Sequence, residues 1–155
     1  MLPQPGDHLV FAFGEQAGES INASKIIVDQ APLAAYPKDL QQGVVRNRSR
    51  LNLVMVVRVD PRALSAQTTA YATDGLVAYS AVCTHTGCTV EGWNAGTRRM
   101  ICPCHGSEYD AADAARVTFG PAPKPLAMLP LTVVDDALVI SGGFSRRVGF
   151  QQPNR

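Results

Sequence analysis

Two short runs hold every cysteine of the chain and two of its three histidines. Residues 83–88 read Cys-Thr-His-Thr-Gly-Cys, and residues 102–107 read Cys-Pro-Cys-His-Gly-Ser. Thiolates and imidazoles at such short spacing are typical ligands of soft and borderline metals. The chain must therefore fold so that both runs reach the same end of the molecule and form one metal site.

The number of candidate ligands separates the possible metals. A mononuclear zinc site uses four ligands, and zinc sites favour paired cysteines two to four residues apart in each half, which these runs lack. A 2Fe-2S cluster in which two histidines replace two cysteines on one iron also uses four ligands, and the remaining two thiols can form a disulfide. Two plain disulfides would leave the matched histidines unexplained. The cluster accounts for the pattern best.

Both runs resemble the ligand loops of the Rieske iron-sulfur proteins, whose patterns C-x-H-x-G-C and C-x-C-H-G-S are matched at every fixed position. The resemblance implies one Rieske-type 2Fe-2S cluster held by four residues. Cys83 and Cys102 would bind one iron, and His85 and His105 the other. Rieske oxygenases and their ferredoxins lack the extra cysteine pair, so the chain resembles the respiratory branch of the family.

The same resemblance assigns roles around the cluster. It implies a disulfide between Cys88 and Cys104. It also implies a hydrogen bond from the Ser107 hydroxyl to a bridging sulfide and one from the Tyr109 hydroxyl to a cysteine sulfur. Such bonds favour the reduced state, so we expect a potential toward the positive end of the Rieske range, which runs from about −150 to +300 mV. Residues 120–125, Gly-Pro-Ala-Pro-Lys-Pro, resemble the proline loop that covers the cluster.

His85 and His105 have a second predicted role, which makes them the candidate catalytic residues. Each binds through one ring nitrogen and leaves the other free to exchange a proton, so electron and proton transfer are expected to be coupled. A quinol hydroxyl could then hydrogen-bond to one of these rings. The residue before the first-run glycine is commonly leucine in quinol-oxidising relatives, whereas this chain has Thr86.

The pattern of the remaining chain predicts a mostly β fold. At 155 residues and 46% apolar, the chain is expected to form one domain over residues 1–155. The resemblance implies a Rieske-type antiparallel β-sandwich base with a cluster-binding subdomain inserted at residues 82–126. Alternating residues between Gly, Pro and Asp-Gly turns predict strands at 9–13, 51–59, 76–82, 98–101, 116–119, 132–134 and 137–140. Turns are predicted at 74–75, 94–96 and 135–136.

Other segments carry weaker signals. Residues 61–72 are predicted to form a short helix or structured excursion capped by Asp60, and residues 22–32 allow no firm assignment beyond a turn near 22–25. Arg46, Arg48 and Arg50 are interpreted as a charged loop or strand edge, and His8 as a solvated residue near the N-terminus. Basic and acidic residues number 14 and 13, so no nucleic-acid partner is expected.

These observations favour a Rieske electron-transfer subunit of a quinol:cytochrome c oxidoreductase, which would not catalyse alone. Cytochrome b, a c-type cytochrome and quinol are the implied partners, and the disulfide implies the periplasm or the periplasmic side of a bacterial inner membrane. No apolar run approaches the length of a membrane helix, so membrane association is expected through a segment absent from this sequence. The alternatives are a relay subunit of a soluble periplasmic oxidoreductase such as arsenite oxidase, or an iron-free, disulfide-stapled binding module.

Overall fold

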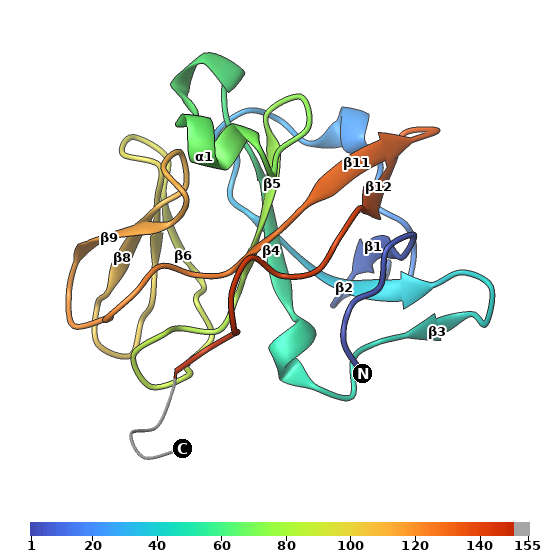
Figure 1. Cartoon of the computed structure of the whole chain (residues 1–155), viewed down its shortest axis with the longest axis horizontal. Coiled ribbons are helices and arrows are strands. Elements are labelled where there is room, and N and C mark those ends of the chain that lie inside the picture. Colours follow the sequence, from blue (N-terminus) through green and yellow to red (C-terminus); the bar gives the residue numbers. More distant parts are fainter. Residues whose placement is uncertain (151–155) are drawn as a thin grey trace.

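Two antiparallel sheets contain all strands of the computed structural model, which describes residues 1–150 (Figure 1). The larger sheet has the order β10-β5-β4-β2-β1-β12-β11, and β3 pairs with β2. Its strands are β1 (His8–Phe11), β2 (Leu33–Asp39), β3 (Val44–Val45), β4 (Val54–Arg58), β5 (Leu76–Ser80), β10 (Met128–Leu129), β11 (Leu131–Val134) and β12 (Ala137–Ile140). The predicted mostly β, antiparallel fold is confirmed.

Pro130 brings the two ends of the larger sheet together. β10 and β11 lie at opposite ends of the strand order, yet this single residue separates them in the chain. The segment before β5 also meets β11, because the Thr73 hydroxyl donates a hydrogen bond to the Leu131 carbonyl over 2.6 Å. The sheet therefore curls into a nearly closed barrel, which leaves few unpaired strand edges.

The central strands β4 and β5 are buried on both faces. Val54 and Val56 point into the barrel core, whereas Met55 and Val57 belong to a second core that includes Tyr109 of the smaller sheet. Strands buried on both faces carry continuous apolar runs instead of alternation. This double burial explains the apolar stretch at 53–57 and fixes the smaller sheet against one wall of the barrel.

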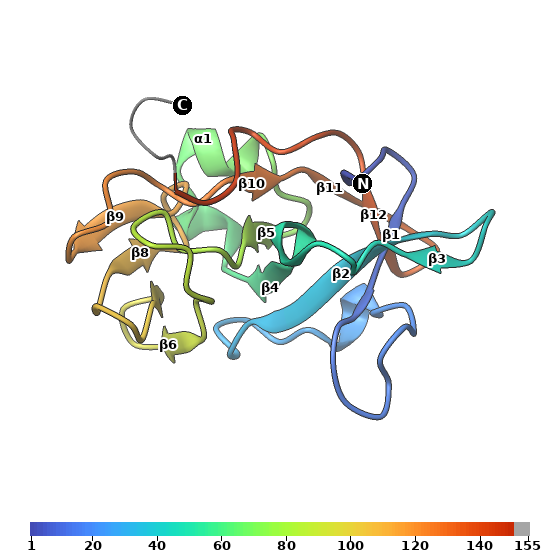
Figure 2. The same ribbon diagram turned by 90° about the horizontal axis from the view of Figure 1, so that it is seen from below.

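The smaller sheet stands beside the barrel (Figure 2). Its order is β6-β7-β8-β9, and its strands are β6 (Gly92–Asn94), β7 (Arg99–Ile101), β8 (Glu108–Asp110) and β9 (Arg116–Phe119). This sheet lies within the subdomain expected at residues 82–126, although the exact bounds of that subdomain stay a prediction.

The predicted turns form where acidic residues and glycine tolerate left-handed backbone. Asp135 and Asp136 have φ values of 49° and 65° and close the hairpin between β11 and β12. Asp74 and Gly75 make the turn into β5 in the same way. A Cβ atom on Gly75 would lie 2.2 Å from the Val59 carbonyl oxygen, so only glycine fits there.

Several predicted elements are shorter than expected. The strand predicted at 51–59 begins only at Val54, because the 3-10 turn η2 (Arg50–Asn52) precedes it. The segment 61–72, predicted as a short helix or structured excursion, consists of a 3-10 turn, η3 (Pro61–Ala63), followed by a short helix, α1 (Ala66–Thr69). Asp60 caps η3 as predicted, because its carboxylate accepts a hydrogen bond from the Arg62 amide. The turn expected near 22–25 is η1 (Ala23–Lys25).

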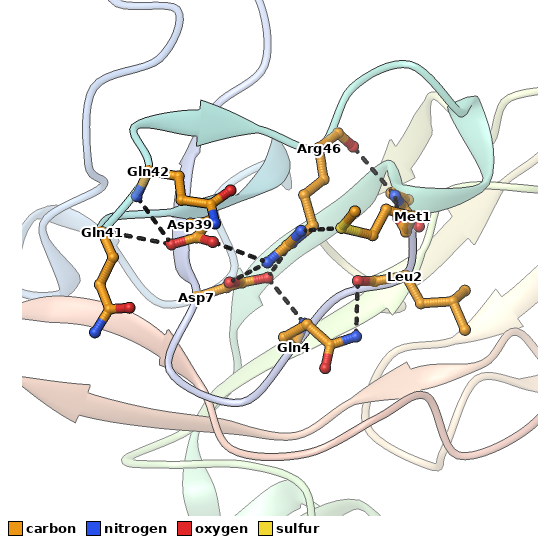
Figure 3. A network of polar contacts seen from close by, with 9 residues as sticks. Met1, Leu2, Gln4, Asp7, Asp39, Gln41, Gln42 and Arg46 are labelled. Carbon is orange, nitrogen blue, oxygen red and sulfur yellow. Dashed lines mark hydrogen bonds and ion pairs between the residues drawn. The ribbon is translucent and has the colours of Figure 1, made fainter.

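A buried ion pair near the N-terminus corrects the prediction for Arg46. Its guanidinium donates hydrogen bonds to both carboxylate oxygens of Asp7, at 2.7 and 3.1 Å, and its Nη1 lies 2.6 Å from the Met1 sulfur (Figure 3). Arg46 is therefore a structural residue instead of a charged loop residue. His8 is half-buried instead of fully solvated. It lies in β1 opposite Lys38 of β2, and its Nδ1 atom lies 3.3 Å from the Ser20 hydroxyl.

Within residues 1–150, no helix combines the length and apolar character needed to cross a bilayer. α1, for example, spans only Ala66–Thr69, whereas a crossing needs about 20 residues. The predicted membrane association therefore stays a prediction, because it concerns a segment outside this sequence.

Candidate metal centre

Residues 83–88, here called the first ligand loop, follow β5 in a tight backbone turn. The Cys83 amide donates to the Cys88 carbonyl over 2.8 Å, and the Gly87 amide donates to the Cys83 carbonyl over 3.0 Å. Gly87 has a φ of +84°, which is a left-handed conformation that favours glycine. These bonds hold the loop so that its ligands lie on one side of the turn.

Residues 102–107, here called the second ligand loop, repeat this pattern between β7 and β8. The Cys102 amide donates to the Ser107 carbonyl, and the Gly106 amide donates to the Cys102 carbonyl, both over 2.9 Å. Gly106 also has a left-handed φ, at +79°. In each loop the glycine stands four residues after the first cysteine. The equal spacing therefore produces the same turn in both loops.

The two loops place the four predicted ligands as two pairs, one of thiols and one of imidazoles. Cys83 and Cys102 are free thiols and both are buried, with 2% and 1% of their surface exposed. The rings of His85 and His105 meet edge to face, with their centroids 4.8 Å apart. His105 is exposed and His85 half-buried. The thiols therefore form the inner side of the site and the imidazoles the outer side.

The other two cysteines link the two loops covalently. Cys88 of the first loop and Cys104 of the second form the disulfide that the resemblance implies. The Cys102 sulfur lies within 4.8 Å of both disulfide sulfurs. Because a disulfide sulfur offers no thiolate, this close group of three sulfurs is not itself a metal site, and the disulfide instead supports the loop that holds Cys102.

The donor set fits a 2Fe-2S cluster of the Rieske type. The Nδ1 atom of His85 is buried and has no hydrogen-bond partner among residues 1–150, although buried polar atoms are nearly always paired. A metal ion would satisfy this atom. Burial raises the pKa of the Cys102 thiol, so metal binding at this residue would release a proton. Two thiols and two imidazoles match the ligand count of such a cluster.

Tyr109 connects β8 to the first ligand loop. Its hydroxyl lies 3.2 Å from the Cys83 sulfur and accepts a hydrogen bond of 3.2 Å from the Thr84 amide. The side chain is fully buried. Burial, followed by the contact with Cys83, raises the pKa of the Tyr109 hydroxyl far above its ordinary value. The hydroxyl therefore stays protonated and can donate to the Cys83 sulfur, which is the role that the resemblance implies for it.

The proline loop, residues 120–125, packs against both ligand loops. The Thr84 hydroxyl donates to the Lys124 carbonyl over 2.6 Å, and the Ala122 amide donates to the Ser107 hydroxyl oxygen over 3.0 Å. A Cβ atom on Gly120 would lie 2.6 Å from the Ser107 Cα, so the approach requires glycine. Ser107 still has its hydroxyl hydrogen to donate. Its predicted bond to a cluster sulfur stays a prediction.

Sequence reasoning missed three contacts of the first ligand loop. Thr84 links Tyr109 to the proline loop, and its only signal was a hydroxyl between two predicted ligands. The Arg50 guanidinium donates to the Gly87 carbonyl over 2.6 Å, and the Phe150 ring packs against Gly87. Nothing in the local sequence indicates these last two contacts, because both residues are distant from the loop in the chain.

Comparison with protein families decides the assignment. A model described as "Rieske [2Fe-2S] domain" matches residues 30–130, which is most of the chain. The chain belongs to the Rieske family. The match includes both ligand loops and the proline loop.

Relatives of known name cover part of the chain. The cytochrome bc1 complex Rieske iron-sulfur subunit of Streptomyces lividans is 39% identical over 98 residues, which cover 62% of this chain and 58% of that protein. The cytochrome b6-f complex iron-sulfur subunit of Prochlorococcus marinus is 38% identical over 92 residues, covering 58% and 48%. The match thus spans about half the length of these relatives.

A solved structure shares this fold. A ferredoxin of Sphingomonas yanoikuyae B1 has a TM-score of 0.53 with this chain at 18% identity, covering 79% of this chain and 95% of that one. At this identity the likeness concerns the fold alone. It agrees with the nearly closed antiparallel barrel and its attached four-stranded sheet.

Proposed function

We propose that the chain is the 2Fe-2S electron-transfer domain of a quinol:cytochrome c oxidoreductase. When bound, the cluster supplies a one-electron redox centre. Cys83 and Cys102 would hold one iron on the buried side, and His85 and His105 the other on the exposed side. Relatives that are named as subunits of cytochrome bc1 and cytochrome b6-f complexes support this assignment.

The observation that carries the proposal is the exposure of the histidine side of the site. The rings of His85 and His105 lie together at the end of the two loops, and His105 reaches the surface. A ring nitrogen that does not bind iron can accept a hydrogen bond from a quinol hydroxyl and then hold its proton. The same exposed ring offers a short electron path to a c-type cytochrome.

The buried side of the site supports a high potential. The Tyr109 hydroxyl lies 3.2 Å from the Cys83 sulfur, and the proline loop covers the Ser107 side. A hydrogen bond to a ligand sulfur stabilises the more negative, reduced state and so raises the reduction potential. A high potential is required of an acceptor that takes electrons from quinol.

Thr86 favours a second candidate, a relay subunit of a soluble periplasmic oxidoreductase such as arsenite oxidase. This residue is exposed at the tip of the first ligand loop, beside His85. A threonine there buries less apolar surface than leucine against a cytochrome b pocket, a loss on the order of 1 kcal/mol. In the relay role, the exposed tip would contact a partner protein instead of quinol.

Purification of the native gene product separates the two candidates. The tagged protein is taken from its own cells in mild detergent, and the co-purifying material is analysed by visible spectroscopy and metal analysis. Haem b together with haem c supports the quinol:cytochrome c complex. Molybdenum without haem b, recovered from the soluble fraction, contradicts it and supports the relay subunit.

The place of the domain in the cell is part of the same proposal. The disulfide between Cys88 and Cys104 suits an oxidising compartment, so we infer the periplasm or the periplasmic side of a bacterial inner membrane. Alkylation of whole cells with a membrane-impermeant thiol reagent after mild reduction tests this. Labelling of Cys88 and Cys104 in intact cells is the expected result, and labelling only after lysis would contradict it.

A further inference from the structure

An apolar groove lies between the N-terminal segment, η2 and the segment that follows β12. Its volume is about 520 Å³, and its apolar walls are formed by Leu2, Leu51, Phe144 and Val148. Leu2 is 67% exposed and Leu51 48% exposed, so the groove opens to the surface along its length. Exposed apolar grooves of this kind commonly receive a segment of a partner protein.

The charged residues that line the groove are all basic. Arg146 and Arg147 line it, both are exposed, and neither forms an ion pair with any residue in 1–150. The sequence contains no Asp or Glu before Asp7, between Asp39 and Asp60, or after Asp136. All groove residues come from these acid-free stretches. The carboxylate of Asp7 contacts the Gln4 amide at one side of the groove, but it is already paired with Arg46. The positive charge of Arg146 and Arg147 therefore stays unpaired among the described residues and complements an acidic partner.

The wall that carries these arginines continues to the metal centre. Ser145 fixes it to β10, because its amide donates to the Met128 carbonyl and its hydroxyl accepts from the Met128 amide, both over 2.8 Å. Beyond the groove, Gly149 packs near Val82 and Phe150 against Gly87 of the first ligand loop. Figure 1 shows this dark-red segment running from β12 toward that loop.

The opposite wall reaches the same loop. Leu51 belongs to η2, and the neighbouring Arg50 donates to the Gly87 carbonyl over 2.6 Å. Both walls of the groove thus end on the loop that contains Cys83 and His85. A partner held in the groove would therefore lie beside the first ligand loop.

We propose that this groove binds an acidic, apolar segment of a partner protein and so holds that partner next to the metal centre. The apolar walls would take the apolar face of the segment, and Arg146 and Arg147 its carboxylates. An anionic membrane has the same charge but a flat surface, which does not follow a recessed groove, so the geometry favours a peptide segment. The inference does not depend on which oxidoreductase contains the chain.

The test measures binding of defined probes to the full, cluster-loaded chain. One probe is a fluorescein-labelled amphipathic helix of leucine and glutamate, and the other replaces every glutamate by lysine. Fluorescence anisotropy at low and high salt gives both affinities. Co-sedimentation with vesicles of phosphatidylglycerol and phosphatidylcholine tests the membrane. The glutamate peptide is expected to bind best, and its affinity should fall as salt rises.

Two variants with matched controls locate the binding. Arg147→Glu should weaken the glutamate peptide about tenfold, whereas Arg62→Glu, which reverses another exposed arginine outside the groove, should leave it unchanged. Leu51→Asn should also weaken binding, and Leu40→Asn, at a residue of similar exposure outside the groove, should not. The visible spectrum and urea midpoint of each variant confirm that it is folded and loaded.

The outcomes are distinct. Selective, salt-sensitive binding of the glutamate peptide that is lost in Arg147→Glu and Leu51→Asn supports the proposal. Equal binding of the lysine peptide, or unchanged binding in both groove variants, overturns it. Binding of the vesicles but not of the peptide, weakened by Arg147→Glu, also overturns it and assigns the surface to a membrane.

Discussion

Replacing Tyr109 by phenylalanine should lower the reduction potential while the cluster stays bound. The Tyr109 hydroxyl lies 3.2 Å from the Cys83 sulfur in a fully buried position, so water cannot replace it after the change. Hydrogen bonds to charged groups contribute about 1.5 to 3 kcal/mol, and the part that differs between the two redox states is about 1 kcal/mol. At about 59 mV and 1.4 kcal/mol per tenfold change for one electron, this predicts a decrease of about 40 mV.

Tyr79→Phe is the matched control for this prediction. Tyr79 is also fully buried, and its hydroxyl donates to the Ala111 carbonyl instead of contacting a ligand sulfur. Both variants lose a buried hydrogen bond, so each should lose about 1 kcal/mol of unfolding free energy. Only Tyr109→Phe should change the potential measured by protein-film voltammetry. An unchanged potential in that variant, or an equal decrease in Tyr79→Phe, would refute the reasoning.

Three further predictions concern other parts of the chain. Arg50→Gln should release the first ligand loop and speed loss of the cluster, which is measured as bleaching of the visible spectrum. Arg48→Gln should leave the rate of cluster loss unchanged. Asp7→Asn leaves the buried Arg46 charge with only its longer contact to Asp39, at 3.6 Å, and should cost about 3 kcal/mol in urea unfolding; a loss below 1 kcal/mol would contradict this. Hydrogen bonds from Ser24 lower the pKa of Asp136, so they stabilise the fold at neutral pH and are lost as pH falls through that pKa. Asp136→Asn should therefore reduce the dependence of the urea midpoint on acid pH.

Local patterns were the most predictable part of the molecule. The strands expected at 116–119 and 137–140 coincide with β9 and β12, because turn residues flank each of them closely. The ligand loops were predictable for the same reason, since each is a six-residue turn whose bonds close within the loop. The pairing of Cys88 with Cys104 came from family resemblance, because spacing alone permits other pairings.

Features that depend on distant partners were not predictable. β2 was missed because Pro37 interrupts its pattern, although the strand pairs with both β1 and β4. Arg46 was taken for a surface residue because its partner, Asp7, is 39 residues away in the chain. The contact of Arg50 with the first ligand loop has the same origin. Such contacts follow from how the strands pack, which no short stretch of sequence records.

The reduction potential measured against pH tests the central claim, which is a cluster held by His85 and His105 that couples electron and proton transfer. Voltammetry of the loaded protein from mildly acid to alkaline pH is the direct measurement. If ring protons leave more easily from the oxidised form, the potential should be level in acid and fall in alkali, by about 59 mV for each pH unit per coupled proton. A potential that stays level over the whole range would contradict the account.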